Sequence, residues 1–294
     1  MSGGPDSMAL LLLTAAAFPQ NLSALSVDHR LRPESAQECA LVADLCAALG
    51  IPHATLAVDV APGNLQANAR SARYAAMAQW MAEKGLRDLA TAHHADDQAE
   101  TLLMRLNRGS GVAGLAGIRR ASLREDGLPV GAMRVVRPLL GWRKSELGVL
   151  CESAGIETAH DPSNRDAAYD RVRLREALGQ AAWLDPAALA ISARHLGEAD
   201  EALEWATTQE WDAQVVAGEN ALSYRPAAPR AVRMRVLARA VAHLAGADRA
   251  TPRGGELAQF LDRLESGEGG NIGGVLIKVA DGVWTMGAEP QRRV

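Results

Sequence analysis

Cysteine, phenylalanine and tyrosine are scarce in this chain of 294 residues, which contains three, two and three of them. The three cysteines, Cys39, Cys46 and Cys151, form no CxxC pair and no even set, so the sequence excludes a disulfide framework. Cys39 and Cys46 lie seven residues apart, on one face of an expected helix. We therefore expect buried, reduced thiols in a cytoplasmic protein.

Long apolar runs are also missing, since no segment approaches the roughly 20 apolar residues that a membrane helix needs. Residues 8–17 are apolar, but Asp6 precedes them and no lysine or arginine does. A secretory signal begins with basic residues, so this run does not fit one. We expect no membrane contact and a cytoplasmic location.

The net charge of −4 argues against a generic nucleic-acid binder, so the distribution of charge matters more than its sum. Basic and acidic residues number 6 and 11 in residues 1–100, 13 and 9 in residues 101–180, and 12 and 15 in residues 181–294. A basic excess is thus confined to the middle of the chain.

Short apolar runs alternate with segments of helical period over the first part of the chain. The expected strands are residues 22–28, 53–58, 88–92 and 135–140, and the expected helices are residues 8–17, 34–49, 66–84 and 96–106. This alternation predicts an α/β fold with a parallel sheet flanked by helices.

The alternation stops near residue 180, and residues 186–215 and 230–244 are expected to be helices. Two strand-like runs flank Asp281-Gly282, which predicts a β-hairpin within residues 274–286. We expect a first domain over residues 1–178 and a smaller, mainly helical domain with a terminal hairpin over residues 179–294.

The segment Ser2-Gly3-Gly4-Pro5-Asp6-Ser7 stands directly before an apolar helix. Glycines let backbone amides turn toward an anion, serine hydroxyls add donors, and the helix presents its positive end, so this segment suits phosphate. An ordinary N-cap at Asp6 or Ser7 would explain the same residues. A Walker A loop is excluded, because no lysine occurs before Lys84.

Asp28 and His29 follow the expected strand 22–28, at the edge where α/β folds bind their ligands. The alternative is a solvated loop, with Pro33 beginning the next helix. Either structure agrees with the local sequence.

The segment from His93 to Thr101, HHADDQAET, follows another expected strand and opens a helix. Asp97 and Glu100 share a helix face, where like charges repel unless a cation lies between them. Magnesium or an ammonium group suits such carboxylates, whereas adjacent histidines lack the spacing of a zinc helix. Alternatively, Asp96 is an N-cap and the acidic residues complement the helix dipole.

Arginines gather in two later segments. Arg105 and Arg108 precede the glycine-rich residues 109–114, and a guanidinium matches phosphate oxygens, although a C-cap at Gly109 is an alternative. Residues 161–175, DPSNRDAAYDRVRLR, contain four arginines, and two of them lie one helical turn apart. A phosphate-binding face or a solvated charged helix would explain this segment.

The segment SGGPDS resembles the pyrophosphate-binding loop of the PP-loop ATP pyrophosphatase superfamily, which splits ATP between its α and β phosphates. With VDHRLR, HHADDQAET, the RGSG-VAGL loop, VVRPLL and DPSNRDAAYDRVRLR in this order, the chain is similar to tRNA(Ile)-lysidine synthetases. The resemblance covers residues 2 to 176 closely, and the later region less specifically resembles the family's smaller substrate-binding domain.

The resemblance implies a reaction and its partners. Such enzymes bind Mg-ATP, transfer AMP to the position-2 oxygen of the wobble cytosine in the CAU anticodon of tRNA(Ile), and release pyrophosphate. The amine of L-lysine then attacks that carbon and expels AMP, leaving lysidine. The expected cofactors are ATP and Mg²⁺. The sequence does not determine the oligomeric state, so a homodimer stays open.

The resemblance also implies residue roles. It assigns ATP binding to Ser2, Gly3, Gly4, Pro5, Asp6, Ser7, Asp28, His29 and His93. Asp6 would also hold the metal, Asp97 and Glu100 would hold lysine or a metal, and Arg108 would stabilise phosphate during adenylation. Arg171, Arg173 and Arg175 would meet tRNA phosphates.

Two features depart from the family pattern. Relatives carry an apolar strand before SGG, which is not present here, so we expect a start assigned too far downstream or a boundary set by cloning. Val172 replaces an asparagine that follows the family arginine.

Three other functions agree less well with the residues. Sulfur insertion at cytidine uses cysteine pairs, and ammonia-dependent amide formation needs a glutaminase partner. The third is a non-catalytic RNA- or nucleotide-binding protein.

Overall fold

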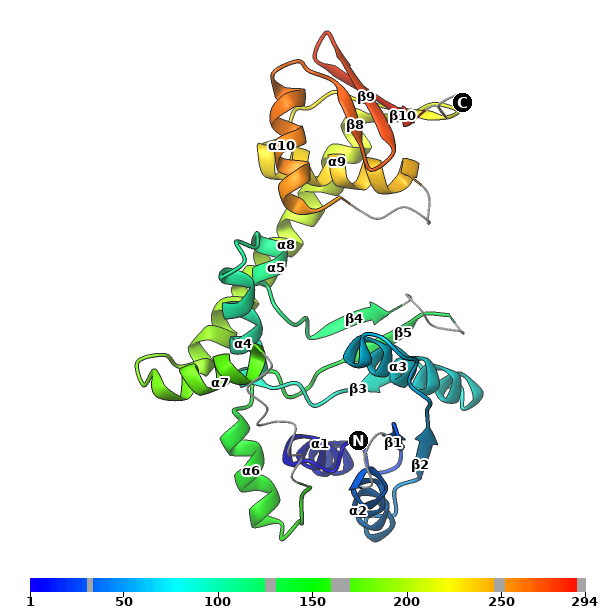
Figure 1. Cartoon of the computed structure of the whole chain (residues 1–294), viewed down its shortest axis with the longest axis vertical. Helices are drawn as coiled ribbons and strands as arrows, with labels where there is room; N and C mark the ends of the chain where they lie inside the picture. Colours follow the sequence, from blue (N-terminus) through cyan, green and yellow to red (C-terminus); the bar gives the residue numbers. More distant parts are fainter. Residues whose placement is uncertain (31–33, 125–130, 160–169, 246–251, 290–294) are drawn as a thin grey trace. The chain divides into compact units, whose positions relative to one another are not determined.

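The computed structural model describes residues 1–30, 34–124, 131–159, 170–245 and 252–289. The chain divides into two compact units, Met1–Gly197 and Glu198–Val294, which are coloured blue to green and yellow-green to red in Figure 1. Each unit is described by itself. The domain boundary expected between residues 178 and 179 stays a prediction.

Helices and strands alternate along unit 1. Its elements are α1 (Pro5–Ala17), β1 (Ala24–Asp28), α2 (Glu34–Ala48), β2 (His53–Ala57), α3 (Leu65–Glu83), β3 (Asp88–Ala90), α4 (Ala95–Leu106), α5 (Val112–Leu115), β4 (Ala121–Arg124), β5 (Met133–Val136), α6 (Lys144–Ser153), α7 (Asp170–Gln180) and the first part of α8 (Pro186–Gln214). The helices expected from periodicity are all present.

Parallel strand pairs form the framework of unit 1. β1 pairs with β2, and β3 pairs with β5, each in parallel. The α/β prediction is confirmed, but the described residues form two small sheets rather than one, and β4 joins β5 antiparallel. β4 was not predicted, because two of its four residues are exposed and it contains no apolar run.

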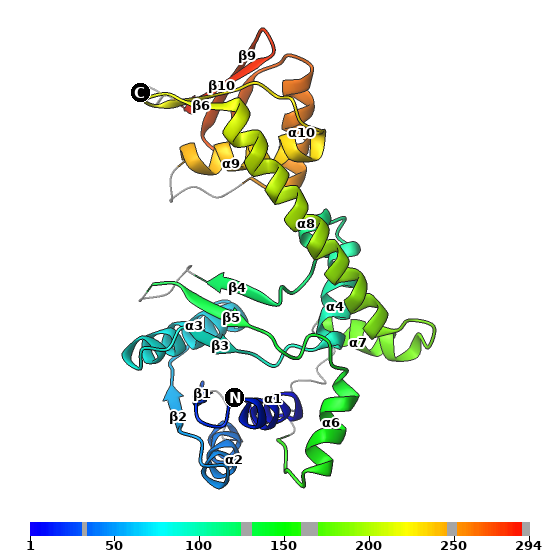
Figure 2. The same ribbon diagram turned by 180° about the vertical axis from the view of Figure 1, so that it is seen from behind.

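Two apolar clusters hold the helices of unit 1 in place. One joins α1, α2 and α6 through side chains such as Met8, Val42 and Leu147. The other packs α3 against β1 and β5 and includes Tyr74 and Val135. Both views show α3 beside β3 and β5 (Figures 1 and 2). The three cysteines are buried free thiols, as predicted.

Unit 2 is built on an antiparallel sheet rather than on helices alone. After the end of α8 come β6 (Val215–Ala217), β7 (Ala221–Tyr224), α9 (Arg230–Ala245), α10 (Gly254–Glu265), β8 (Gly270–Ile272), β9 (Val275–Ala280) and β10 (Val283–Ala288). The strand order is β6-β7-β10-β9-β8, and α9 and α10 pack on the sheet through one apolar cluster. The predicted helices α8 and α9 are present, whereas β6, β7 and β8 were missed because they are only three or four residues long.

The predicted hairpin is confirmed, with Val283 opposite Ala280 across a two-residue turn. Asp281 and Gly282 have φ values of 51° and 72°. Two consecutive left-handed residues give the turn that matches the twist of paired strands, which is why Asp-Gly predicts it. Among the described residues, no helix is both long and apolar enough to cross a bilayer.

Candidate functional site

The loop before α1 requires glycine at its second position. Gly3 has a φ of 71°, and a Cβ built on it would lie 3.2 Å from both Ala159 Cβ and the Glu38 carbonyl oxygen. The amide of Ala159 donates a 2.8 Å hydrogen bond to the Gly3 carbonyl. A side chain at this position would press against Ala159 and the Glu38 backbone and would also be strained by the positive φ.

The first turn of α1 has no side-chain cap. Gly4 is the N-cap residue and Pro5 is the first helical residue, so the alternative of a cap by Asp6 or Ser7 is wrong. The Ser7 hydroxyl instead donates to the Gly4 carbonyl at 3.0 Å and accepts a longer contact of 3.4 Å from the Ser2 amide. The amides of this turn therefore keep their capacity to bind an anion.

His94 caps the acidic helix α4. The Asp97 amide donates to His94 Nδ1 at 3.4 Å, and the His94 amide donates to Asp97 Oδ2 at 3.2 Å. This reciprocal pair is a capping box with histidine in place of serine, so the alternative of an N-cap at Asp96 is wrong.

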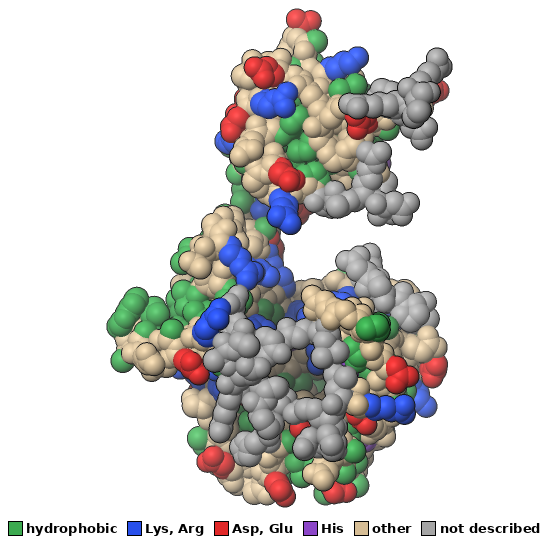
Figure 3. Space-filling view, in the orientation of Figure 1, with side chains coloured by type: hydrophobic (Ala, Val, Ile, Leu, Met, Phe, Trp, Pro, Cys, Tyr) green, Lys and Arg blue, Asp and Glu red, His purple; other side chains and the backbone are tan. Residues whose placement is uncertain are grey.

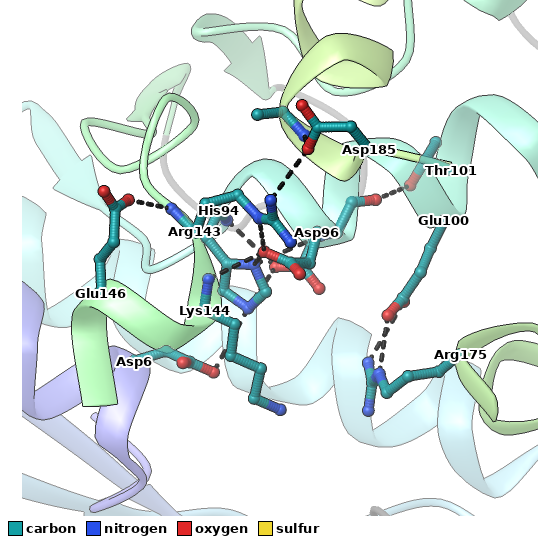
Figure 4. A network of polar contacts seen from close by, with 12 residues as sticks. Asp6, His94, Asp96, Glu100, Thr101, Arg143, Lys144, Glu146, Arg175 and Asp185 are labelled. Carbon is teal, nitrogen blue, oxygen red and sulfur yellow. Dashed lines mark hydrogen bonds and ion pairs between the residues drawn. The ribbon is translucent and has the colours of Figure 1, made fainter. Parts of the chain in front are cut away.

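His94 also joins α4 to the loop of α1, as Figure 4 shows. Its Nε2 lies 3.5 Å from Asp6 Oδ2 and 3.5 Å from Asp97 Oδ2, and its side chain is only 3% exposed. Burial acts to lower the pKa of His94, but Asp6 and Asp97 outweigh burial and raise that pKa. The two motifs thus form one network.

Asp6 is only partly satisfied by this network. Its Oδ1 is buried and has no hydrogen-bond partner among the described residues. Burial acts to raise the pKa of Asp6, but His94 and Lys144 lower it below its ordinary value. An ionised carboxylate with a free buried oxygen is suited to a cation or a donor.

Asp96 holds the turn before α6. Its Oδ2 accepts a 2.8 Å hydrogen bond from the Lys144 amide and lies 3.6 Å from Arg143 Nε. Arg143 in turn donates to Asp185 at 2.9 Å. Asp96 therefore positions neighbouring segments, as the sticks in Figure 4 show.

Glu100 is the most deeply buried carboxylate of α4, with a side chain 1% exposed. Arg175 grips it with two hydrogen bonds of 2.7 Å and 3.2 Å, and Arg171 Nε lies 3.4 Å away. The sequence predicts a cation between Asp97 and Glu100. Beside Glu100, Arg171 and Arg175 supply part of this positive charge, although these arginines were expected to contact tRNA phosphates. Arg173 lies on the same helix and is exposed. Val172, between Arg171 and Arg173, is buried.

The residues predicted to line the nucleotide pocket, Asp28, His29 and His93, differ in their hydrogen-bond partners. Asp28 accepts a 2.7 Å hydrogen bond from the Ser35 hydroxyl, the main cause of its lowered pKa. His29 Nδ1 is buried and unpartnered among the described residues. Burial lowers the pKa of His93 to about 4, and its Nδ1 shares a 2.9 Å hydrogen bond with Thr91. His93 is therefore neutral at pH 7.

The glycine-rich loop after α4 is fastened by two side chains of that helix. Gln98 Oε1 accepts a 2.6 Å hydrogen bond from the Ile118 amide, and Arg105 donates to the Gly114 carbonyl at 2.6 Å. Arg108 is exposed, and its guanidinium has no partner among the described residues. Of the two arginines, Arg105 is structural and Arg108 is available.

Three positions in the network had no predicted role: His94, Arg143 and Lys144. His94 stood within the recognised motif, but only the fold shows which of two adjacent histidines faces Asp6.

Residues 31–32 of VDHRLR and 161–169 of DPSNRDAAYDRVRLR lie outside the described residues. Figure 3 shows Lys and Arg side chains gathered on the side of unit 1 where α4, α5 and α7 lie, and Asp and Glu side chains mainly along the outer edge of the unit.

Comparison with known proteins identifies the family. The model of the PP-loop domain family matches residues 1–182. The chain is 46% identical to the tRNA(Ile)-lysidine synthase of Novosphingobium aromaticivorans, across 100% of this chain and 89% of that protein. The chain belongs to the tRNA(Ile)-lysidine synthase family.

A second member of this family, from Zymomonas mobilis subsp. mobilis, is 40% identical over 91% of this chain and 81% of its own length. Among solved structures, a U34-tRNA thiolase from Methanococcus maripaludis matches 62% of this chain and 70% of its own, with a TM-score of 0.46 and 18% identity. That likeness is too low to add to the family assignment.

Proposed function

We propose that this protein ligates L-lysine to C2 of the wobble cytidine in the CAU anticodon of tRNA(Ile), through an adenylated cytidine. The observation that carries the proposal is the network from Asp6 to His94 and Asp97. This network joins the first turn of α1, where phosphate would bind, to Asp97, a carboxylate that suits an amine. The proposed location of the reaction is the cytoplasm.

The loop Ser2 to Ser7 would bind the β and γ phosphates of ATP. Uncapped amides at the start of α1 and the steric need for glycine at Gly3 support this assignment. Asp28, His29 and His93 would line the nucleotide pocket, and the unpartnered Nδ1 of His29 supports a ligand there.

Asp6 is the candidate ligand for Mg²⁺, since its buried Oδ1 has no partner among the described residues. No group of three or more His, Cys, Asp or Glu side chains is placed to hold a metal within the described part of the chain. This agrees with Mg²⁺, which usually takes one or two carboxylates together with substrate phosphates. When bound, Mg²⁺ would neutralise charge on the phosphates.

The reaction has two balanced steps. The position-2 oxygen of cytosine attacks the α-phosphorus of ATP, an O–P bond forms, and the bond to pyrophosphate breaks. The lysine amine then attacks C2, a C–N bond forms, the C2–O bond breaks, and AMP leaves with that oxygen while nitrogen loses a proton. Arg108, exposed and unpartnered among the described residues, would stabilise charge on the phosphate.

Asp97 suits the lysine ammonium better than Glu100 does. The Asp97 side chain is 19% exposed, whereas Glu100 is 1% exposed and already held by Arg175. A carboxylate already paired with a guanidinium gains less from a second cation. Arg171, Arg173 and Arg175 would contact tRNA phosphates, with Glu100 holding α7 in place for this role.

The test is pyrophosphate release and lysidine formation by the purified chain with Mg-ATP, lysine and a CAU-anticodon tRNA(Ile) transcript. Asp6→Asn should reduce the rate by about 100-fold or more, the typical effect of removing a charge-stabilising group. The matched control is Asp59→Asn, because the Asp59 side chain is 93% exposed. Repeated turnover of pyrophosphate release without lysine, beyond the single adenylation of each tRNA, or equal activity in both variants, would contradict the proposal; tRNA binding without turnover would favour a binding protein.

A further inference from the structure

A pocket of about 350 Å³ lies in unit 1, and two of its lining residues, Val135 and Arg137, belong to the VVRPLL motif, to which no residue role was assigned. Its lining residues are Arg70, Tyr74, Ser122, Leu123, Arg124, Val135 and Arg137. Three of these seven are arginines, and no carboxylate is among them in the described part of the chain. A concave site with this charge is suited to an anion.

Strand alternation places two of the arginines on one face, at opposite ends of the Ser122–Val135 pair, with Arg124 opposite Met133. Ser122 lies opposite Val135 in the antiparallel pair of β4 and β5. Arg124 follows Ser122 by two residues, and Arg137 follows Val135 by two residues, so all four side chains project from one face. The basic face is therefore a consequence of the strand register.

Helix α3 supplies the opposite wall. Arg70 and Tyr74 are four residues apart and share a helix face. The guanidinium carbon of Arg124 lies 4.2 Å from the centroid of the Tyr74 ring, and that of Arg70 lies 5.1 Å from it. The buried ring thus holds two guanidinium groups at the pocket.

The pocket arginines have unused donors. The Nε atoms of Arg124 and Arg137 are buried and have no hydrogen-bond partner among the described residues. Arg137 Nη1 donates to the Arg119 carbonyl at 2.8 Å and to Ser122 Oγ at 3.0 Å, which fixes its orientation. Burial lowers the pKa of Arg137, as expected for a partly buried cation. A buried donor left unpaired is costly, so a ligand would stabilise this arrangement.

We propose that this pocket binds one phosphate group, separately from the loop before α1. Guanidinium forks match phosphate oxygens bidentately, and three of them complement a phosphate better than the single charge of a carboxylate. Arg137 and Arg70 both act to lower the pKa of His93, so the pocket lies near the candidate site. The phosphate comes from an RNA backbone or from a nucleotide. The inference goes beyond the proposed reaction, because binding at this pocket can be measured without turnover.

The test measures binding of the full chain to an unmodified tRNA(Ile) transcript and, separately, to ATP. The Arg70→Gln/Arg124→Gln double variant should bind one of the two at least tenfold more weakly. If RNA is the source, the slope of log affinity against log salt also falls by about one or two, while ATP affinity stays within twofold. If ATP affinity alone falls, the source is the nucleotide.

Arg134→Gln is the matched control, because Arg134 directly precedes the pocket residue Val135, its side chain points to the other face of β5, and it pairs with Asp88 at 2.6 Å. It should leave both affinities unchanged. Equal losses in the double variant and this control, or no loss in either, would overturn the phosphate site, provided that thermal unfolding shows both variants folded.

Glu125 and Asp126 follow Arg124 in the sequence, outside the described residues. A Glu125→Gln/Asp126→Asn variant that binds more than tenfold tighter would also overturn the inference, because the arginines would then be neutralised already.

Discussion

The two units of this chain bury different kinds of side chain. Among the described residues, the buried polar side chains of unit 1 are Ser7, Ser26, His94, Gln98 and Glu100, and that of unit 2 is Thr207. Unit 2 has one continuous apolar cluster, and its ion pairs, such as Arg230 with Glu265 at 2.8 Å, lie at partly exposed positions. Unit 1 therefore uses its interior to orient polar groups, whereas unit 2 uses its interior for packing.

This difference means that the polar interior of unit 1 mainly positions side chains, whereas the apolar core of unit 2 mainly stabilises the fold. Burying charges costs desolvation energy that their pairing only partly returns, so Glu100 and His94 define positions more than they stabilise the fold. Apolar burial stabilises directly, by about 25 cal/mol per Å². We therefore expect substitutions in unit 2 to change stability most, and substitutions in the network of unit 1 to change the site.

The largest expected effect is in the core of unit 2. Leu261→Ala should lower the free energy of unfolding by about 3–4 kcal/mol, because Leu261 is 0% exposed and its removal leaves a cavity. Native-state hydrogen exchange of the α9 and β9 amides measures the loss in this unit. Val216→Ala, at a side chain 68% exposed, is the control and should cost less than about 0.5 kcal/mol. Similar losses in both variants would refute the packing account.

A smaller effect is expected from the buried ion pair of unit 1. Arg175→Ala leaves Glu100 buried with Arg171 alone nearby, and should cost about 2–3 kcal/mol. Glu100→Gln should cost less, about 1–2 kcal/mol, since the Arg175 side chain is 37% exposed and can reach water. Urea unfolding of both variants measures the order, and a larger loss in Glu100→Gln would reverse our assignment of the buried partner.

Asp97 should affect substrate binding rather than stability. If Asp97 holds the lysine ammonium, Asp97→Asn removes a charged hydrogen bond of about 1.5–3 kcal/mol, which is roughly a 10- to 100-fold increase in KM for lysine. The KM for ATP should change less than about twofold. Steady-state kinetics with each substrate varied separately distinguishes these effects, and equal increases in both KM values would contradict a lysine-specific role.

The smallest effect concerns the one buried phenol of the unit 2 cluster. Tyr224 donates a 2.9 Å hydrogen bond to Glu210, and Tyr224→Phe should cost about 1 kcal/mol. Burial, and then Glu210, raise the pKa of Tyr224 above its ordinary value. The unfolded chain therefore ionises first, so this contribution is complete below about pH 10 and is lost as pH rises further. The difference in urea midpoint between the wild-type chain and Tyr224→Phe should therefore be smaller above pH 10 than at pH 8. A difference that does not change with pH would refute the linkage.

Sequence patterns were most informative where structure depends on near neighbours. Helical period predicted α1 to α4 within a few residues, and Asp281-Gly282 predicted the hairpin from its turn conformation. Short strands such as β4 and β6 carry too few side chains to show alternation, so the pattern missed them. The motifs indicated which segments form the site, but not which atoms meet.

The sequence by itself determined the α/β framework of unit 1, the hairpin at Asp281-Gly282, and the family to which the chain belongs. Tertiary structure decided which partner each charge takes: Glu100 meets Arg175, 75 positions away, and Asp6 meets His94 rather than His93. The reason is physical. Backbone periods and turns follow from adjacent residues, whereas a charge is satisfied by whichever distant group the packing brings within a few ångströms of it.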